Sequence, residues 1–236
     1  MNDLKTFVTN KILPNVEMPA QYTGGEWNAV VKNHNNVEIS VALAFPDTYS
    51  IGMSHIGIQI IYFLLNDRND TVCERVFAPW PDMEREMRNS NTPLFSLETY
   101  TTINKFDIVA FSLQYEMSYT NVINMLDLAK IPIKGKDRTE EHPIIMAGGP
   151  SALSPEPMAD FIDIFVLGDG EDVLPELIDF IKPINKRGDL TREEKIKSIA
   201  KNIKGIYAPQ FYEITYHSNG TIKAINGIRN NPPKIR

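Results

Sequence analysis

Residues 143–168 read PIIMAGGPSALSPEPMADFIDIFVLG, two apolar runs joined by a loop rich in glycine, serine and proline. Both runs are rich in β-branched residues and are apolar at nearly every position, whereas a strand with one solvated face alternates apolar and polar residues. We therefore interpret them as buried parallel strands. Three earlier runs share this character: EISVALAF (38–45), VCERVFAP (72–79) and DIVAFSL (107–113).

Segments with helical periodicity alternate with these runs. Apolar residues recur at i, i+3 or i+4 in IGIQIIYFLLND (56–67), PDMEREMRNS (81–90), SYTNVINMLDLAK (118–130) and EDVLPELIDFIK (171–182). Strands that alternate with helices form a parallel sheet covered on both faces. The sequence predicts an α/β, flavodoxin-like (Rossmann-type) three-layer fold with a doubly wound, five-stranded parallel sheet.

We expect the chain to be divided into three regions. Residues 1–37 form an N-terminal extension, with a short helical stretch and a strand that turns back at His34–Asn36. Residues 38–183 form the α/β domain. Residues 184–236 contribute a helix over the basic stretch 182–204, a β-hairpin with a type I′ turn at Asn219-Gly220, and an exit, IRNNPPKIR, that reads as a linker.

Composition excludes several classes of protein. The formal charge is −6, and the basic residues gather at 182–204, so most of the chain would repel nucleic acid. No run approaches about 18 apolar residues, and no apolar segment follows the polar N-terminus, which predicts a cytoplasmic protein without a membrane partner. Cys73 is the single cysteine, so the chain holds no disulfide, thiolate zinc site or all-cysteine iron–sulfur site. We expect Cys73 to be a strand residue.

Small and polar residues follow the predicted strands, where ligands bind in doubly wound sheets. The loop after the first strand contains neither the Ser/Thr-rich phosphate loop of a flavodoxin nor the G-x-G-x-x-G of a dinucleotide-binding fold. A phosphoacceptor domain would have a pair of acidic residues here, and Asp47 stands alone. His55 is either a metal or cobalt ligand or a helix-capping group. Ser112 and Gln114 offer a hydroxyl and an amide.

Two glycine-containing segments complete the predicted strand ends. Gly148-Gly149 lets the backbone approach a flat ligand, and Pro150 stiffens the loop after it. Asp169, Glu171 and Asp172 suit the start of a helix. This set favours a cofactor cradle over a catalytic site, and we assign no catalytic or metal-ligating residue. Further candidate wall residues are Tyr49, Met53, Trp80, Gln114, Tyr115 and Glu116.

Five segments carry a resemblance to a known family. QYTGGEWNAVV (21–31), FPDTYSIGMSHIG (45–57), VCERVFAPWPDME (72–84), FSLQYEMSYTNVINMLDLA (111–129) and AGGPSALSPEPMADFIDIFVLGDGED (147–172) resemble the N-terminal cobalamin-binding-type domain of uncharacterised radical SAM proteins. The resemblance implies a domain that positions a corrinoid or an unknown substrate beside a radical SAM barrel in the same full-length polypeptide. It implies cofactor-binding roles for Ser54, His55, Gly57, Ser112, Gln114, Gly148, Gly149, Pro150, Gly168 and Gly170.

The chain departs from that family in two respects. The D-x-H-x-x-G signature is not met, because Ser54 falls where the histidine belongs and His55 comes one residue late, so we expect cobalamin without a histidine ligand. The three cysteines of a radical SAM cluster are absent, which places the iron–sulfur cluster and S-adenosylmethionine in a missing barrel after Arg236.

The resemblance implies that the full-length protein is a radical SAM enzyme and that this chain alone is not catalytic. Two alternatives remain open. One is a cofactor-free scaffold or recognition domain that has lost cobalamin. The other is an independent flavodoxin-like protein that binds a small molecule with Asp47, His55 and Glu116.

Overall fold

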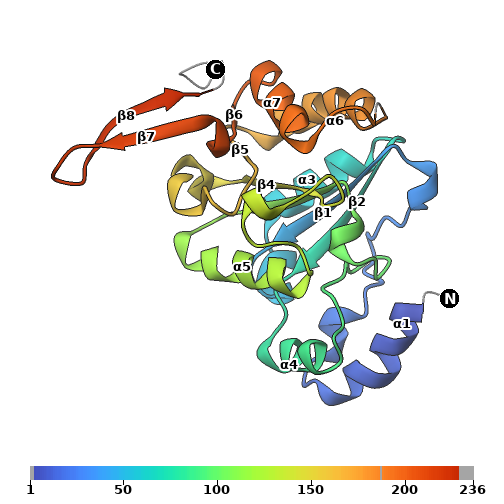
Figure 1. Cartoon of the computed structure of the whole chain (residues 1–236). Helices are drawn as coiled ribbons and strands as arrows, with labels where there is room; N and C mark the ends of the chain where they lie inside the picture. The colour runs from blue at the N-terminus through green and yellow to red at the C-terminus, as the bar shows by residue number, and fades with distance from the viewer. Residues whose placement is uncertain (1–2, 187, 229–236) are drawn as a thin grey trace.

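The computed structural model describes residues 3–186 and 188–228 and contains a six-stranded sheet (Figure 1). The strand order is β2-β1-β3-β4-β5-β6; the first five strands are parallel, and β6 runs antiparallel to β5. The strands are β1 (Ile39–Phe45), β2 (Thr71–Phe77), β3 (Ile108–Ser112), β4 (Ile144–Gly148), β5 (Ile164–Val166) and β6 (Ile206–Tyr207). The predicted α/β class and parallel sheet are confirmed. The sheet has six strands instead of five, because the two-residue strand β6 is too short to give a periodic signal.

Helices cover both faces of the sheet (Figure 1). On one face lie α3 (Ile56–Asn66), α6 (Gly170–Lys186) and α7 (Arg192–Asn202). On the other lie α4 (Pro81–Asn89), α5 (Tyr119–Leu128) and the N-terminal helical segment α1 (Asp3–Phe7) with η1 (Val8–Ile12). A five-residue helix, α2 (Tyr49–Met53), follows β1. Short helical turns occupy η2 (Leu13–Asn15), η3 (Pro19–Tyr22), η4 (His34–Asn36), η5 (Ile103–Lys105), η6 (Glu116–Ser118), η7 (Gly135–Asp137), η8 (Pro150–Leu153), η9 (Glu156–Met158) and η10 (Pro209–Phe211).

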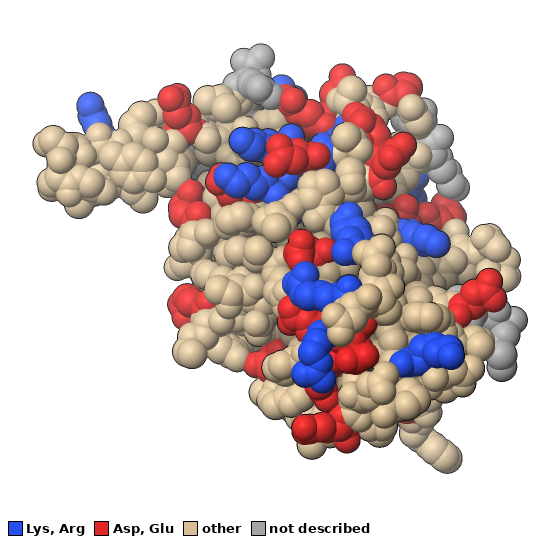
Figure 2. All heavy atoms as spheres, turned by 60° about the horizontal axis from the view of Figure 1, so that its bottom comes forward, with Lys and Arg blue, Asp and Glu red and all other residues tan. Residues whose placement is uncertain are grey.

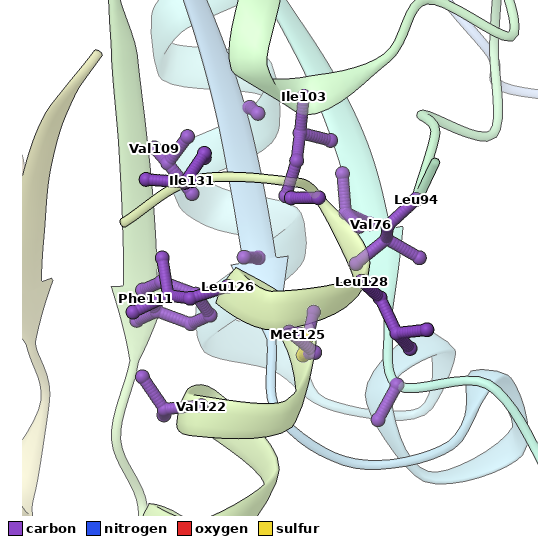
Figure 3. Packing of buried hydrophobic residues seen from close by; sticks show 14 of the residues in the cluster. Val76, Leu94, Ile103, Val109, Phe111, Val122, Met125, Leu126, Leu128 and Ile131 are labelled. Carbon is purple, nitrogen blue, oxygen red and sulfur yellow. The ribbon is translucent and has the colours of Figure 1, made fainter. Parts of the chain in front are cut away.

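The two faces bury separate apolar clusters because the strands are apolar on both sides. All seven residues of β1 are buried, as expected for a central strand between two helical layers. Figure 3 shows Val122 and Leu126 of α5 beside Phe111 of β3, and Met125 belongs to the same buried cluster. The i, i+3, i+4 pattern of α5 thus covers the sheet.

The edge strand β2 is covered by parts of the chain that are distant in sequence. Its polar residues Glu74 and Arg75 are buried, as is Cys73, whose thiol pKa is raised by burial. Leu97 donates its backbone N–H to the carbonyl of Arg75 at 2.9 Å, so the loop that contains Leu97 protects part of the exposed edge. Cys73 is a strand residue, as predicted.

The predicted strand within residues 21–37 is absent, and helical turns η3 and η4 lie there instead. Side chains replace a strand partner in this segment: the backbone N–H of Val30 donates to the hydroxyl of Tyr62 at 2.7 Å. The backbone at Gly24 has φ of +63° and lies so close to Leu97 that a Cβ would stand 2.4 Å from the Leu97 carbonyl oxygen. The segment is therefore shaped to fit the loop beside β2.

The C-terminal region differs from expectation in two details. The basic stretch 182–204 is not one helix, because α6 continues to Lys186 and α7 begins after Thr191, which forms a capping box with Glu194. The predicted hairpin is confirmed as β7 (Tyr212–Tyr216) and β8 (Ile222–Gly227). Its turn is not type I′: Gly220 has φ of +83° but Asn219 does not have positive φ. Residues 229–236 of the predicted linker lie outside the described residues.

Among the described residues, no helix is both long enough and apolar enough to cross a membrane.

Candidate functional site

A cavity of about 490 Å³ lies at the carboxyl ends of β1, β3, β4 and β5. The strand order reverses between β1 and β3, which is where doubly wound sheets bind ligands. Helices α3 and α6 form its walls. We call it the strand-end cavity. Its apolar lining consists of Leu43, Ile58, Ile61, Ala110, Phe111, Met146, Leu153, Val166 and Leu174.

The structure brings nine of the ten predicted cofactor residues together around this cavity. They are His55, Gly57, Ser112, Gln114, Gly148, Gly149, Pro150, Gly168 and Gly170. Ser54 is the exception: it is exposed at the end of α2, and its hydroxyl donates to the carbonyl of Ser50 at 2.9 Å. Ser54 is committed to its own helix because a serine at a helix end can bond back to the carbonyl four residues earlier.

Glycine residues leave the cavity wall without side chains at the ends of β4 and β5. Gly149 has φ of +96°, and a Cβ there would stand 2.6 Å from the Leu113 carbonyl oxygen. Gly168 has φ of +137° with no atom within 4 Å of a Cβ, and a Cβ on Gly148 would meet only Val166, at 3.8 Å. Gly149 and Gly168 are thus required by the backbone, and Gly148 and Gly168 leave open space where a side chain would otherwise stand.

One polar pair enters this apolar surface. The side-chain amide of Gln114 donates to the hydroxyl oxygen of Ser112 at 2.7 Å, and both residues line the cavity. Ser112 ends β3, and Gln114 follows two residues later. The pair gives the cavity a fixed hydroxyl and amide, the type of group that orients a ligand in a mainly apolar pocket.

His55 precedes α3 and lines the opposite wall. Its ring packs against Phe45 with centroids 5.3 Å apart, and it makes no capping hydrogen bond to the helix. Nδ1 is buried and has no hydrogen-bond partner in the described chain. The ring is placed by packing, and a Cβ on Gly57 would lie 3.0 Å from its Cε1.

The start of α6 contributes acidic residues that sequence reasoning assigned only to the helix end. Asp169 and Glu171 line the strand-end cavity, and among the residues that the structure describes no lysine or arginine lines it. The cavity wall is therefore apolar with an acidic component. Gly170 is the residue in the sequence that could have indicated their position in the cavity wall. A Cβ there would lie 3.0 Å from Ile61 of α3, so the glycine allows α6 to approach α3 and close the cavity.

Five of the six candidate wall residues lie outside the cavity lining, and Gln114 alone belongs to it. The hydroxyl of Tyr115 donates to Asp47 Oδ2 at 2.5 Å, which joins the loops after β3 and β1. The hydroxyl of Tyr49 donates to Glu26. The other three outside the lining are Met53, Trp80 and Glu116.

The described residues hold no group of three or more His, Cys, Asp or Glu side chains able to bind a metal. Exposed apolar side chains instead occur on the segments that follow strands β1 to β4. They are Ile51, Ile56, Trp80, Tyr115, Met117 and Leu153. Large apolar side chains gathered at one end of a domain are typical of an interaction surface.

Comparison with known proteins adds family information. Residues 57–209 match the family described as radical SAM proteins, N-terminal. The chain is also similar to the uncharacterized protein MJ0966 of Methanocaldococcus jannaschii, at 27% identity over 154 residues. That alignment covers 64% of this chain and 28% of the relative, so most of the relative's length lies outside it. No solved structure matches.

Proposed function

The chain belongs to the family of N-terminal domains of radical SAM proteins, and from this premise we propose that its strand-end cavity binds cobalamin beside a radical SAM barrel. In this proposal the chain is a binding and positioning domain. Cleavage of S-adenosylmethionine, with its iron–sulfur cluster, belongs to the barrel, because one cysteine cannot hold that cluster.

The observation that carries the proposal is the strand-end cavity itself. Its volume, about 490 Å³, lies within the range of small-molecule pockets. Gly148 and Gly168 leave its wall without side chains, and Phe111, Met146 and Leu174 supply apolar surface. These properties suit the insertion of a flat aromatic group, such as the base of the cobalamin nucleotide tail.

The residues present fit this group in part. Gly148, Gly149 and Gly168 would contact a flat ring, and the Ser112–Gln114 pair would hydrogen-bond its polar edge. No cationic side chain in the described part of the chain lines the cavity, so a tail phosphate would remain outside, away from Asp169 and Glu171. When bound, cobalamin would supply a carrier for a methyl group.

The position of His55 determines whether a bound cobalamin could take a histidine ligand from this chain. Its ring is packed against Phe45 and Gly57, with Nδ1 buried. A side chain held in this way forms part of the wall, and the D-x-H-x-x-G signature is not met. We therefore propose that cobalamin binds without a histidine ligand from this chain.

The exposed apolar residues around the strand ends support the placement of a barrel at this end of the sheet. Tyr115, Met117 and Leu153 follow β3 and β4, next to the cavity-lining residues Gln114 and Pro150. A domain packed on these side chains would bury them and close the cavity. The cofactor would then lie between the two domains, with solvent excluded.

The test is retention of hydroxocobalamin by the purified chain on a desalting column. We expect about one equivalent to elute with the protein, and Gly148→Leu to reduce retention at least tenfold. Gly148 suits this test because a Cβ there makes only ordinary contact with Val166, so leucine fills the cavity without disturbing the backbone.

Ala159→Leu is the matched control, because Ala159 lines a separate cavity beside Tyr207. It adds the same leucine side chain and should leave retention unchanged. Equal retention by wild type and Gly148→Leu would show that corrinoid binds elsewhere and would overturn the assignment. Absence of retention by both the chain and the full-length protein would overturn cobalamin binding altogether.

A second candidate is a cofactor-free recognition domain whose cavity binds a neutral or cationic substrate. It is favoured by the cavity lining, where no lysine or arginine of the described residues accompanies Asp169 and Glu171. Failure of hydroxocobalamin retention in the full-length protein would select it. The third reading, an independent binding protein that uses Asp47, His55 and Glu116, lacks this support because only His55 lines the cavity.

A further inference from the structure

The hairpin β7–β8 has one apolar and one polar face. Paired residues of an antiparallel hairpin share a face, and Ile214 and Tyr216, two residues apart on β7, fall on the same side as their partners Ile225 and Ile222. These partners are three residues apart on β8 because the register shifts between Thr215 and Tyr216. The alternating pairs, Glu213–Asn226 and Thr215–Ala224, fall on the other. We call the set Ile214, Tyr216, Ile222 and Ile225 the apolar hairpin face.

This face is not covered by the rest of the described structure. Tyr216, Ile222 and Ile225 are 58%, 50% and 44% exposed. The hairpin projects from the body of the domain, and its surface in Figure 2 carries few charged side chains. Its strands contact each other extensively and other elements only sparsely. A two-stranded hairpin is marginally stable in water unless its apolar face packs against another element.

The apolar hairpin face continues into a second cavity at the base of the hairpin. This hairpin cavity has a volume of about 270 Å³, and Tyr212 and Ile214 line it together with Tyr207 and Ile162. Its remaining wall carries both signs of charge, from Lys134, Lys136, Glu156, Asp160 and Asp163. An element lying along the hairpin would therefore meet apolar surface on one side and mixed charge at its edge.

We propose that the apolar hairpin face packs against the polypeptide that comes after the N-terminal domain in longer members of this family. The matching element would be amphipathic, with an apolar side chain entering the hairpin cavity. The family match ends at residue 209, and the hairpin begins at Tyr212, so the hairpin lies at the junction of the N-terminal domain with the later part of such a polypeptide. The aligned part is 28% of the relative's length, so that relative contains further polypeptide of the kind the proposal requires.

The inference rests on the part of the proposed function that places a further domain in the same polypeptide. It does not depend on cobalamin. All measurements are therefore made without corrinoid, so that loss of corrinoid binding and failure of hairpin docking are separate results.

The test compares hydrogen exchange of the β7 and β8 amides in residues 1–236 and in the polypeptide encoded by the complete reading frame. We expect exchange at least tenfold slower in the longer polypeptide. Ile225→Asp should abolish that difference, because it places a charge on the apolar hairpin face. Asn226→Asp, which adds the same charge one residue later on the polar face, should preserve it.

Three results would overturn the proposal. One is equal exchange in the two polypeptides, and another is a reading frame that stops at Arg236. The third is protection in residues 1–236 that rises with protein concentration and is lost in Ile225→Asp, which would assign the face to a second copy of the chain.

Discussion

A Cβ atom on Gly149 would stand 2.6 Å from the carbonyl oxygen of Leu113, and the two residues come directly after the ends of neighbouring strands β4 and β3. The same carbonyl accepts a hydrogen bond from the backbone N–H of Ser151 at 3.1 Å. The loop after β4 is therefore held against β3 at a distance that excludes any side chain. This contact fixes the glycine wall of the strand-end cavity.

Gly149→Ala is expected to destabilise the fold by about 2 kcal/mol or more, because alanine is strained at φ of +96° and its methyl group meets the Leu113 carbonyl. Gly148→Ala should lower the free energy of unfolding by less, since a Cβ there meets no atom closer than 3.8 Å. Urea unfolding of both variants measures the difference. Equal losses of stability would contradict the tight contact at Gly149.

Asp163→Asn is expected to lower the free energy of unfolding by about 3–5 kcal/mol. Asp163 is buried and pairs with Arg138 Nη1 at 3.0 Å and Arg192 Nη2 at 2.6 Å, so the substitution leaves two buried guanidinium groups without their carboxylate. Asp160→Asn, at an exposed carboxylate nearby, is the control. Similar unfolding midpoints for both variants would show that the buried pairs contribute little.

Lys32→Met is expected to destabilise by about 2 kcal/mol, because the Lys32 ammonium donates to the carbonyls of Asn66, Arg68 and Thr71 at 2.6, 2.6 and 2.8 Å. Methionine keeps the apolar stem and removes all three hydrogen bonds. Lys11→Met, at an exposed lysine, should be nearly neutral. Thermal unfolding distinguishes them, and a neutral Lys32→Met would contradict the role of Lys32 in fixing the loop before β2.

The stability of the fold is expected to decrease between pH 5 and 7.5 through Glu98. Burial raises the pKa of Glu98 to about 7 even though its carboxylate accepts hydrogen bonds from Arg75. The unfolded carboxyl titrates near 4.5, so the folded state binds more protons between these values and loses stability as pH rises through them.

Glu98→Gln should remove this component, because glutamine does not titrate. Free energies of unfolding are measured for both proteins from pH 5 to 8, and the advantage of wild type over Glu98→Gln should shrink as pH rises. The two proteins differ only at residue 98, so the pH dependence of their difference reports Glu98. A constant difference across the range would show that the pKa of Glu98 is not raised.

The sequence was sufficient to predict much of the strand-end cavity but not all of its walls. Ser112, Gly148 and Gly168 were predicted to lie together because the carboxyl ends of parallel strands converge at one edge of a sheet. Asp169 and Glu171 were not predicted as lining residues, because their position depends on how closely α6 approaches α3 at Gly170. The distance between α6 and α3 is set by tertiary packing, which cannot be predicted from the local sequence pattern.

The segments that cover the edge strand β2 could not be predicted from local sequence patterns either. Glu74 and Arg75 interrupt an apolar strand, and they are tolerated there only because distant residues pair with them. His34 Nε2 lies 2.8 Å from Glu74 Oε1, and Glu98 accepts from Arg75. Residues 21–37 were predicted to include a strand for the same reason: their tertiary partners, such as Tyr62, are not visible in a sequence of 17 residues.

Cobalamin binding is measured by the visible absorption spectrum of the chain after passage with hydroxocobalamin through a desalting column, for wild type and for His55→Ala. We expect corrinoid bands at about one equivalent in both proteins, with the same spectrum, because in our proposal no histidine of this chain ligates the cobalt. Absence of corrinoid bands from wild type and from the full-length protein would contradict the binding of cobalamin in the strand-end cavity. A spectrum of nitrogen-ligated cobalt that is lost in His55→Ala would contradict the assignment of His55 to the cavity wall.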